Sequence, residues 1–433
     1  MPQNWKTYKL KDIVDQDRGI SYGIVQPGKH DPNGVPILKI NNLTGNSFNI
    51  NDLHFVSKNV EEKYKKTRLR GGELLVSLVG SLGAVYTVPR EMIGYNVVRA
   101  LAVIPVLNEF SPNWVMYYLR APFAQNILQQ IATTSVQATI NLKELREIII
   151  PFPEKKERES IASILSAIDD KIELNLQMNK TLEEMAMALY KHWFFDFGPF
   201  QDGEFVESEL GEIPKGWEVK TLEDIIRFSN GYAFKSKQLL KEEEQNSFHI
   251  FKMGHILKGG GLKADGTKSW IKKSDCKGLE KFILKTGDIL MSMTDMKDNM
   301  TILAHTALMN EDNKYIVNQR VGLLRVANKY GIDYPFVFLL TNSSDFIQRL
   351  RSQANSGVQV NLSTSAIKSA KVVVPIKDVN IEFNNITLPY YESINQNALE
   401  NQTLTQLRDT LLPKLISGEV RVIDVEKTLS EIL

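Results

Sequence analysis

Lysine is concentrated in one stretch of the second half of the chain. Between Lys252 and Lys285 there are nine lysines and only three acids, and a second basic run, KNVEEKYKKTRLR, occupies residues 58–70. Ammonium and guanidinium groups neutralise phosphates, so such runs can support the binding of a polyanion. A solvated surface is the alternative interpretation. The candidates for phosphate contacts are Lys65, Lys66, Arg68, Arg70, Lys252, Lys258, Lys272, Lys273 and Lys285.

Predicted turns rich in amide, hydroxyl and aromatic groups supply a second kind of chemistry. If the polyanion is DNA, polar side chains on turns can reach base edges while phosphate contacts fix the register. Taken singly, each of these residues also fits an ordinary surface position. In the first half the candidates are Ser21, Tyr22, Gln26, Lys39, Asn41, Asn42, Ser77, Ser81, Arg99, Thr133, Thr134 and Gln137. In the second half they are Tyr232, Phe234, Lys235, Thr294, Asp295, Lys297, Gln319, Arg320, Asn355, Ser356 and Gln359.

Motifs for catalysis are not found. Residues 261–269, GLKADGTKS, resemble a phosphate-binding loop, but Thr267 takes the place where that motif needs lysine. His249 and His255 flank FKMG without a third metal ligand at a suitable spacing. There is no GxSxG, no HExxH and no asparagine-diproline-aromatic motif. The pattern favours a recognition or assembly subunit that binds no cofactor or metal itself, rather than an enzyme.

One unit is written twice in the sequence. The framework of WKTYKLKDI, residues 5–13, recurs in WEVKTLEDI, residues 217–225, at an offset of 212 (217 − 5). GISY, residues 19–22, is echoed by GYAF, residues 231–234, at the same offset. Further matches pair GGELLVSL (71–78) with TGDILMSM (286–293), SVQ (135–137) with GVQ (357–359), and IIIP (148–151) with VVVP (372–375). Such agreement over a whole half indicates an ancient duplication.

Each unit is predicted to have an α+β globular part followed by a long helix. Short apolar runs broken by Pro and Gly turns predict strands, and a helix is expected over residues 113–131 and again over 334–350. The Gly- and Pro-rich stretch between the units predicts a linker. The expected boundaries are a globular domain over 1–152, a helical region over 153–197, a linker over 198–216, a globular domain over 217–376, a helical region over 377–422 and a tail over 423–433.

The two long helices carry asparagine where leucine is expected. Apolar residues step by four and three over residues 161–193 as in a heptad seam, but Asn175 and Asn179 fall on it. Asn397 and Asn401 occupy the same places 222 residues later (397 − 175). Because a polar residue in an apolar seam favours the one register that pairs it, we expect the helices to form an antiparallel coiled coil locked by these asparagines.

An alternative is that the seam drifts onto Leu174 or Leu176, which would leave the asparagines in solvent. The second seam is also more polar, with Thr387 and Arg408 on it, where Ile386 and Leu407 could take over. Roughly 35 helical residues span about 50 Å, or about 15 base pairs of DNA. A helix pair of that length would suit a spacer between two globular modules on a split DNA site.

Bulk composition adds a few bounds. The chain has 433 residues, a net charge of +1 and 43% hydrophobic residues, which is typical of a globular protein with two domains or with three or four smaller modules. No apolar run approaches the roughly 18 residues that a membrane helix needs, and the N-terminus has no signal-like core. The lone Cys276 cannot form an internal disulfide. These features predict a cytoplasmic protein without a membrane partner.

Three stretches resemble the specificity subunit of type I restriction-modification systems. They are SELGEIPKGWEVKTLEDI (208–225), GELLVSLVGSLG (72–83) and IASILSAIDDKIELNLQMNKTLEEMAMALYKHWFFDF (161–197). The resemblance covers nearly the full chain. It implies two target-recognition domains that each read half of a bipartite DNA sequence, with helices that set the unread spacer and dock two modification subunits. The turns differ between the units, so the two half-sites are expected to differ.

The resemblance also assigns the chemistry to partners. Two modification subunits would use S-adenosylmethionine to methylate adenine, and two motor-nuclease subunits with ATP and Mg²⁺ would add restriction. The polar seam of the second helix leaves room for unequal docking of the two partner copies. Two other interpretations stay open: a fused methyltransferase whose motifs are unrecognised, and a coiled-coil scaffold that binds only protein. Methyl transfer by the isolated chain would indicate the first, and absence of any DNA binding the second.

Overall fold

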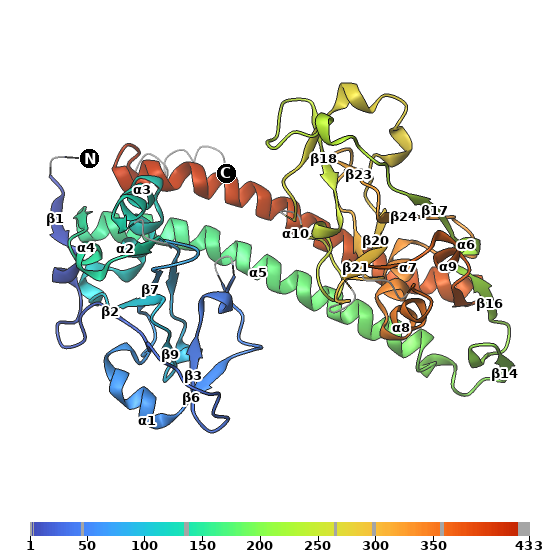
Figure 1. Cartoon of the computed structure of the whole chain (residues 1–433), viewed down its shortest axis with the longest axis horizontal. Helices are drawn as coiled ribbons and strands as arrows, with labels where there is room; N and C mark the ends of the chain where they lie inside the picture. Colours follow the sequence, from blue (N-terminus) through green and yellow to red (C-terminus); the bar gives the residue numbers. More distant parts are fainter. Residues whose placement is uncertain are drawn as a thin grey trace. The chain divides into compact units, whose positions relative to one another are not determined.

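The computed structural model describes residues 2, 4–44, 47–133, 138–263, 266–296, 300–355 and 359–422. The chain forms two compact units. Unit 1 comprises Met1–Leu174 and Glu400–Leu433, and unit 2 comprises Asn175–Leu399. Each unit therefore contains one half of each long helix, α5 (Lys155–Phe194) and α10 (Lys377–Ser417) (Figure 1).

Unit 1 contains a four-stranded sheet in the order β2-β10-β7-β8 and a three-stranded sheet in the order β6-β3-β9. Their strands are Ser21–Tyr22, Leu101–Ile104, Leu74–Ser77 and Val85–Thr87, then His54–Val56, Val35–Leu38 and Asn96–Val97. The strand pairs are β1 (Lys6–Lys9) with β13 (Ile149–Phe152), β4 (Leu43–Thr44) with β5 (Ser47–Phe48), and β11 (Ala132–Thr133) with β12 (Thr139–Ile140). The short helices are α1 (Lys58–Glu61), α2 (Pro112–Arg120), α3 (Pro122–Gln130) and α4 (Leu142–Arg146).

Unit 2 repeats this topology. Its larger sheet has the order β17-β24-β20-β22, and its smaller sheet β19-β18-β23. Their strands are Ile226–Asn230, Val321–Val326, Ile289–Ser292 and Thr306–Leu308, then Trp270–Lys272, Ser247–Phe251 and Tyr315–Val317. The strand pairs are β16 (Glu218–Thr221) with β26 (Lys371–Val374), β21 (Thr294–Met296) with β25 (Gln359–Asn361), and β14 (Phe205–Ser208) with β15 (Gly211–Pro214). The short helices are α6 (Leu222–Ile225), α7 (Tyr334–Asn342), α8 (Ser344–Ser352) and α9 (Thr364–Lys368).

The predicted α+β repeat is confirmed by the hydrogen bonds that open each unit. Strand β1 pairs antiparallel with β13, and β16 pairs in the same way with β26. The next residue repeats as well, since the backbone N–H of Leu10 donates to Ile148 O and that of Leu222 donates to Ala370 O, both over 2.8 Å. The shared framework residues of the two halves therefore hold equivalent strands in place.

The single helices expected over residues 113–131 and 334–350 are each two helices. In unit 1, α2 ends before Ala121, which is extended because Pro122 disfavours helical backbone in the preceding residue. In unit 2 the break comes at Ser343 without a proline. There the side chain of Asn342, the last residue of α7, forms hydrogen bonds with Thr306 on strand β22.

The stretch expected as a linker is folded. Residues 198–200 form a turn of 3-10 helix and the hairpin of β14 and β15 follows. Ile213 is buried, and Phe200 packs its ring against Trp217 at 5.0 Å between centroids. This segment thus belongs to the core of unit 2, while the domain boundaries themselves stay a prediction.

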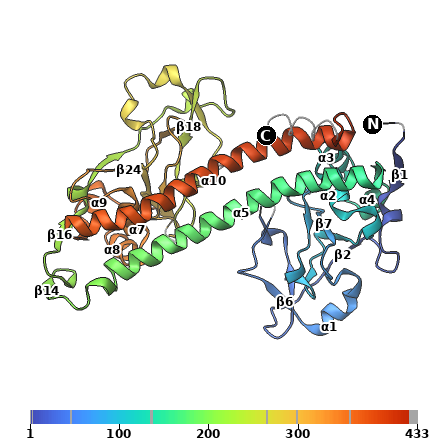
Figure 2. The same cartoon turned by 180° about the vertical axis from the view of Figure 1, so that it is seen from behind.

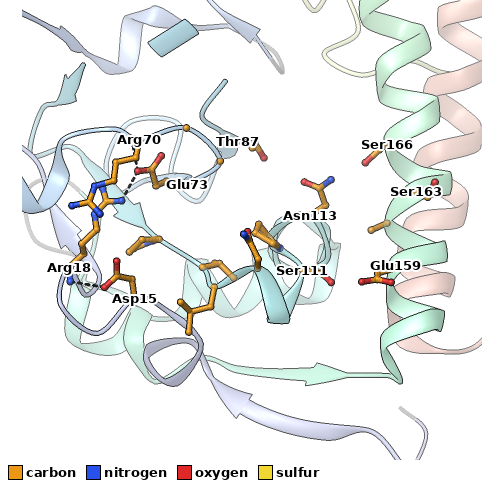
Figure 3. A pocket seen from close by; sticks show the side chains of 18 residues that line it. Asp15, Arg18, Arg70, Glu73, Thr87, Ser111, Asn113, Glu159, Ser163 and Ser166 are labelled. Atoms are coloured by element: carbon orange, nitrogen blue, oxygen red, sulfur yellow. Dashed lines mark hydrogen bonds and ion pairs between the residues drawn. The ribbon is translucent and has the colours of Figure 1, made fainter. Parts of the chain in front are cut away.

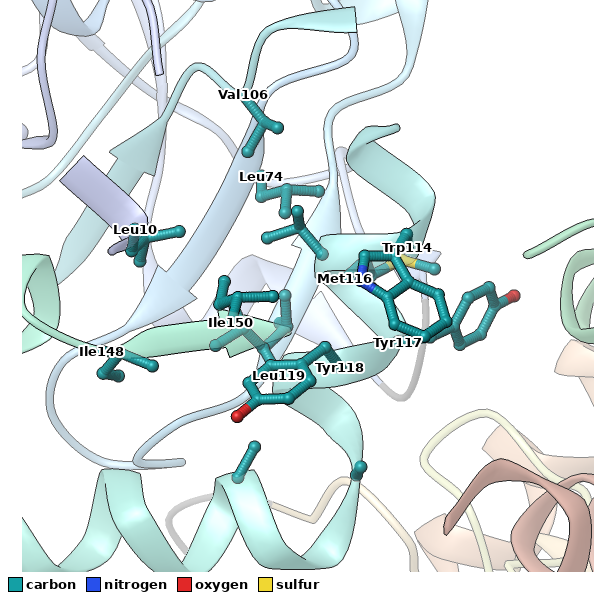
Figure 4. Close-up of a cluster of buried hydrophobic side chains, with 14 of the residues drawn as sticks. Leu10, Leu74, Val106, Trp114, Met116, Tyr117, Tyr118, Leu119, Ile148 and Ile150 are labelled. Carbon is teal, nitrogen blue, oxygen red and sulfur yellow. The ribbon is translucent and has the colours of Figure 1, made fainter. Parts of the chain in front are cut away.

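A buried aromatic cluster joins each globular part to its portions of the long helices. In unit 1, Figure 4 shows Trp114 and Tyr117 of α2 among the buried side chains. The same cluster contains Leu165 of α5 and Leu415 of α10. The indole N–H of Trp114 donates to Pro151 O over 3.0 Å. Burying side chains of this size provides the main driving force for packing. In unit 2 the corresponding cluster contains Tyr190, Trp193, Phe194, Phe336 and Phe383.

Candidate nucleic-acid interface

Three of the predicted base readers are buried and bonded inside the fold. The amide of Asn42 donates to Asn49 O over 3.0 Å, and the hydroxyl of Ser77 donates to Val79 O over 2.7 Å. The hydroxyl of Thr294 donates to Asn361 Oδ1 over 2.8 Å. Because these polar atoms already have partners within the fold, we assign the three residues to the framework and propose no base contact for them.

Other candidates are half-buried or engaged by acids. Arg68 is held by Glu61, with 2.8 Å between Nε and Oε1. The carboxylate of Asp295 accepts from the backbone N–H groups of Ile302 and Leu303 and so fixes its own loop. Burial lowers the pKa of Lys252 below its ordinary value. The half-buried candidates are Ser21, Lys39, Arg68, Phe234, Lys252 and Asp295.

Most candidates lie on the surface, where a partner could reach them. Of the exposed lysines, Lys272 forms an ion pair with Glu244 at 3.3 Å, Lys65 pairs with Glu62, and Lys273 lies over the ring of Phe248. The exposed candidates are Tyr22, Gln26, Asn41, Lys65, Lys66, Arg70, Ser81, Arg99, Tyr232, Lys235, Lys258, Lys272, Lys273, Lys285, Gln319, Arg320, Asn355 and Gln359. Thr134, Gln137, Lys297, Ser356 and the side chain of Thr133 fall outside the described residues.

A three-residue turn is fixed in the same way in both units. In unit 1 it lies between β9 and β10, where Ile24 N donates to Val97 O over 2.7 Å and Arg99 N donates to Ile24 O over 2.9 Å. In unit 2 it lies between β23 and β24, where Tyr232 N donates to Val317 O over 3.0 Å and Gln319 N to Tyr232 O over 2.9 Å. We call residues 98–100 and 318–320 the clamped turns.

A glycine makes each clamp possible. A Cβ on Gly23 would lie 1.9 Å from Val97 O, and a Cβ on Gly231 would lie 2.0 Å from Asn318 O. Only glycine allows the two backbones to approach so closely. These bonds also correct one match of the repeat, because Gly231 is equivalent to Gly23 and not to Gly19. Aligning the second glycine of GISYGIV with NGYA could have revealed this from the sequence.

The predicted asparagines lie between the two long helices. In unit 2, Asn397 Nδ2 donates to Asn179 Oδ1 over 2.8 Å, and Asn179 Nδ2 reaches Ile394 O at 3.4 Å. In unit 1, Asn401 Nδ2 makes the equivalent bond to Ile172 O at 3.3 Å. The helices run antiparallel beside each other in each unit (Figures 1 and 2).

The alternative with the asparagines in solvent is wrong. Asn175 is fully buried, whereas Leu174 and Leu176 are 53% and 52% exposed. Leu407 is also exposed, so it does not replace Arg408 on the seam. Thr387 is buried and its hydroxyl donates to Phe383 O over 2.9 Å.

The sequence reasoning missed a charged cluster that holds the first globular part to the helices. Asp169 of α5 accepts from Tyr117 at 2.9 Å and from Arg120 at 3.3 Å, both on α2, and from Arg408 of α10 at 2.9 Å. Burial lowers the pKa of Arg120, while the neighbouring carboxylate opposes that shift. Arg408 thus lies on the polar seam because it completes this cluster.

A cavity of about 700 Å³, lined by both polar and apolar residues, lies in unit 1 between the globular part and α5. Figure 3 shows Arg18 and Glu73 on one side and Ser163 and Ser166 of α5 on the other. Arg18 and Glu73 form a buried ion pair at 2.6 Å, and Glu73 also accepts from the backbone N–H of Arg70. These charged groups stabilise the wall of the cavity, and we assign no ligand to it.

His249 and His255 lie edge to face, with 4.7 Å between their ring centroids. Their Nε2 atoms are 3.3 Å apart, and the His249 ring stacks on Trp270 at 4.8 Å between centroids. Across the described part of the chain, no three His, Cys, Asp or Glu side chains come together as metal ligands would. A membrane-spanning candidate is likewise not found among the helices in the described ranges.

A family model for the type I restriction modification DNA specificity domain matches residues 2–184 and again residues 214–407. The chain belongs to this family. Specificity subunits of this family are the non-catalytic, DNA-reading components of type I restriction-modification complexes. Both copies of the specificity domain carry a clamped turn, so this element belongs to the common architecture of the two copies.

Named relatives agree with this membership. The MjaIX specificity subunit of Methanocaldococcus jannaschii is 27% identical, with 98% of this chain and 95% of the relative covered. The HindI specificity subunit of Haemophilus influenzae is 24% identical, with 96% and 100% covered. A solved specificity subunit from M. genitalium matches with a TM-score of 0.56 and 18% identity over 96% of this chain and 97% of that one, which supports the fold.

Proposed function

We propose that this chain reads an asymmetric two-part DNA sequence, with one half-site recognised by each copy of the specificity domain. The observation that carries the proposal is the presence of two copies with a shared framework and different exposed residues. Ser77 and Ser292 each donate to the carbonyl two residues ahead, so the framework repeats. The clamped turns, by contrast, differ in residue type. In the repeat, Arg99 is equivalent to Gln319 and Ala100 is equivalent to Arg320.

The helix pair is proposed to set the distance between the half-sites. The asparagine bonds in both units support one register, since Asn179 to Ile394 and Asn401 to Ile172 are equivalent contacts in the repeat. A polar pair in a partly buried seam disfavours alignments of the helices that separate its members. A fixed register would hold the unread spacer at one length.

Partners would supply the chemistry. We place two modification subunits, carrying S-adenosylmethionine, on the helices, and motor-nuclease subunits with ATP and Mg²⁺ on the resulting complex. This chain would then need no cofactor of its own and would act in the cytoplasm, where its DNA target is. The exposed lysines would contribute phosphate contacts that fix the position of the protein on the duplex.

The experiment is to co-express the chain with its cognate modification subunit and to map methylated adenines in the host DNA. Two different half-sites separated by a constant unread spacer are expected. Exchanging residues 1–152 for those of another family member should change one half-site and leave the other. A change in both half-sites would contradict independent reading by the two copies.

Salt dependence separates DNA reading from a protein scaffold. Each phosphate neutralised by a lysine or arginine releases counterions, so log K for the duplex should fall steeply and linearly with log salt. A chain that gives no DNA binding at low salt, alone and with the modification subunit, would overturn the proposed function.

A further inference from the structure

The clamped turns present an arginine in both copies of the specificity domain. In unit 1 it is Arg99, the second residue of the three-residue turn, and in unit 2 it is Arg320, the third. Both side chains are exposed. Within the described part of the chain, neither guanidinium has a hydrogen bond or an ion pair with another side chain.

This freedom distinguishes the pair from arginines that stabilise the fold. Arg325 binds Asp288 through two nitrogens at 2.8 Å each, and Arg120 is bonded to Asp169 and to Val85 O. The N–H donors of those two guanidinium groups already have acceptors within the fold. No described residue occupies the donor edges of Arg99 and Arg320, which are therefore open to a partner outside the chain.

The backbone around both arginines is rigid. Each turn is bonded to the glycine-containing segment beside it, and the gap at Gly23 or Gly231 is too small for any side chain. On the far side of the turn, Leu78 N donates to Ala100 O over 2.8 Å and Met293 N donates to Arg320 O over 3.1 Å. A turn fixed from both sides presents its side chain without the cost of ordering the backbone.

Arg320 is also held in an unusual backbone conformation. Its φ is +71°, in the left-handed region that residues with a Cβ seldom adopt. Such outliers persist where surrounding structure imposes them, and they concentrate at functional sites. Ala100, its equivalent in unit 1, has no such φ. Arg99, the arginine of the first turn, has no such φ either, so the outlier belongs to the second turn alone.

We propose that each clamped turn reads a guanine in its half-site, through Arg99 in the first and Arg320 in the second. This inference rests on the proposed function. The guanidinium of arginine donates two parallel N–H bonds, and guanine offers O6 and N7 as paired acceptors in the major groove. Since the arginines occupy successive positions of equivalent turns, the two guanines would fall at different places within their half-sites.

A base analogue tests this directly. The full chain with its modification subunit is assayed on duplexes of its mapped target in which one guanine at a time is replaced by 7-deazaguanine, which lacks N7. One position in each half-site should weaken binding by about 10- to 100-fold. The modified guanine in the second half-site should no longer matter in Arg320→Gly, a variant that keeps the positive φ without strain.

Matched controls separate base reading from phosphate contact and from misfolding. Arg227→Ala and Arg90→Ala remove exposed arginines elsewhere on the two domains and should leave the 7-deazaguanine effect intact. Arg320→Gly should melt as the wild type does and lose discrimination at one base pair only. Uniform weakening on all sequences, or a half-site without guanine, would overturn the inference.

The two proposals fail differently. If the wild-type complex methylates no defined two-part sequence, the proposed function itself is wrong. If it does so and Arg99→Ala and Arg320→Gly keep full discrimination at every base pair, only the guanine assignment is wrong.

Discussion

The side-chain amide of Asn397 donates to Oδ1 of Asn179 across the interface of α5 and α10, with 2.8 Å between the two atoms. The neighbouring Asn175 is fully buried on the same helix. Polar groups in this position are tolerated because they find each other, and leucine at either position would leave an amide without its partner.

Replacing one member of this pair should destabilise the chain. We expect Asn397→Leu to lower the free energy of unfolding by about 1 kcal/mol, because the half-buried Asn179 side chain loses its donor. Asn179→Leu with Asn397→Leu should recover most of this loss while losing the preference for one alignment. Urea unfolding measures the first effect, and Gln396→Leu on the exposed face of the same helix is the control.

Alignment is measured separately by cross-linking. Lys171 and Glu400 form an ion pair at 3.1 Å, so cysteines at these two positions report the native register. Cysteines at Lys171 and Leu407 report a shift of one heptad. Only the first pair should cross-link in the wild-type background, and both should do so in the double leucine variant. A double variant that cross-links only in the native register would contradict the role of the asparagines.

Asp169→Asn should loosen the attachment of the first globular part. The carboxylate binds Tyr117, Arg120 and Arg408, and the two arginines are only 18% and 19% exposed. Losing the charge should cost about 1–3 kcal/mol, less than for a fully buried pair. Tryptophan fluorescence during urea unfolding follows this loss, with the exposed Asp170→Asn as control. Equal stability of both variants would show that the cluster contributes nothing.

Alanine at the clamp glycines should disable reading in one half-site at a time. A Cβ at Gly231 would overlap Asn318 O, so Gly231→Ala must displace the turn that carries Gln319 and Arg320. We expect degenerate methylation of the second half-site and an unchanged first half-site, together with a loss of about 1–3 kcal/mol in stability. Gly203→Ala, where the nearest non-neighbouring atom is 3.1 Å away, is the control. Unaltered specificity in Gly231→Ala would refute the clamp.

Gln359→Ala tests a second reading element in unit 2. Gln359 is exposed on β25 and pairs with Met296 of β21. If its amide forms hydrogen bonds with a base edge, its removal should reduce the preference for one base at one position of the half-site. The expected loss of binding free energy is about 1–3 kcal/mol. Gln137, its counterpart in the sequence repeat, carries the same expectation for the first half-site. Methylation profiles of the two variants decide the matter, since uniform weakening would assign either residue to the framework.

The sequence predicted the repeat well because buried positions constrain residue type. Equivalent places keep the same residue type in both halves. Examples are Trp5 and Trp217, and the apolar runs 148–151 and 372–375, which contribute to strands β13 and β26. The asparagines could be found for the same reason, since a polar residue in a heptad seam is visible from periodicity alone.

Other features depend on contacts that a single sequence does not display. The break at Ser343 depends on the bond between Asn342 and Thr306, which are 36 residues apart. Asn42, Ser77 and Thr294 looked like base readers because their polarity was visible while their internal partners were not. The hairpin at residues 205–214 was taken for a linker since its glycines and acids suggested solvent, whereas Ile213 is buried.

A heptad insertion is the most direct measurement of the role of the helix pair. Seven residues added after Leu176 and seven after Ala398 would lengthen both helices by about 10 Å, or about three base pairs. Mapping of methylated adenines should then return the same two half-sites with an unread spacer about three base pairs longer. The same half-sites at the original spacing would contradict the claim that α5 and α10 set the distance between them.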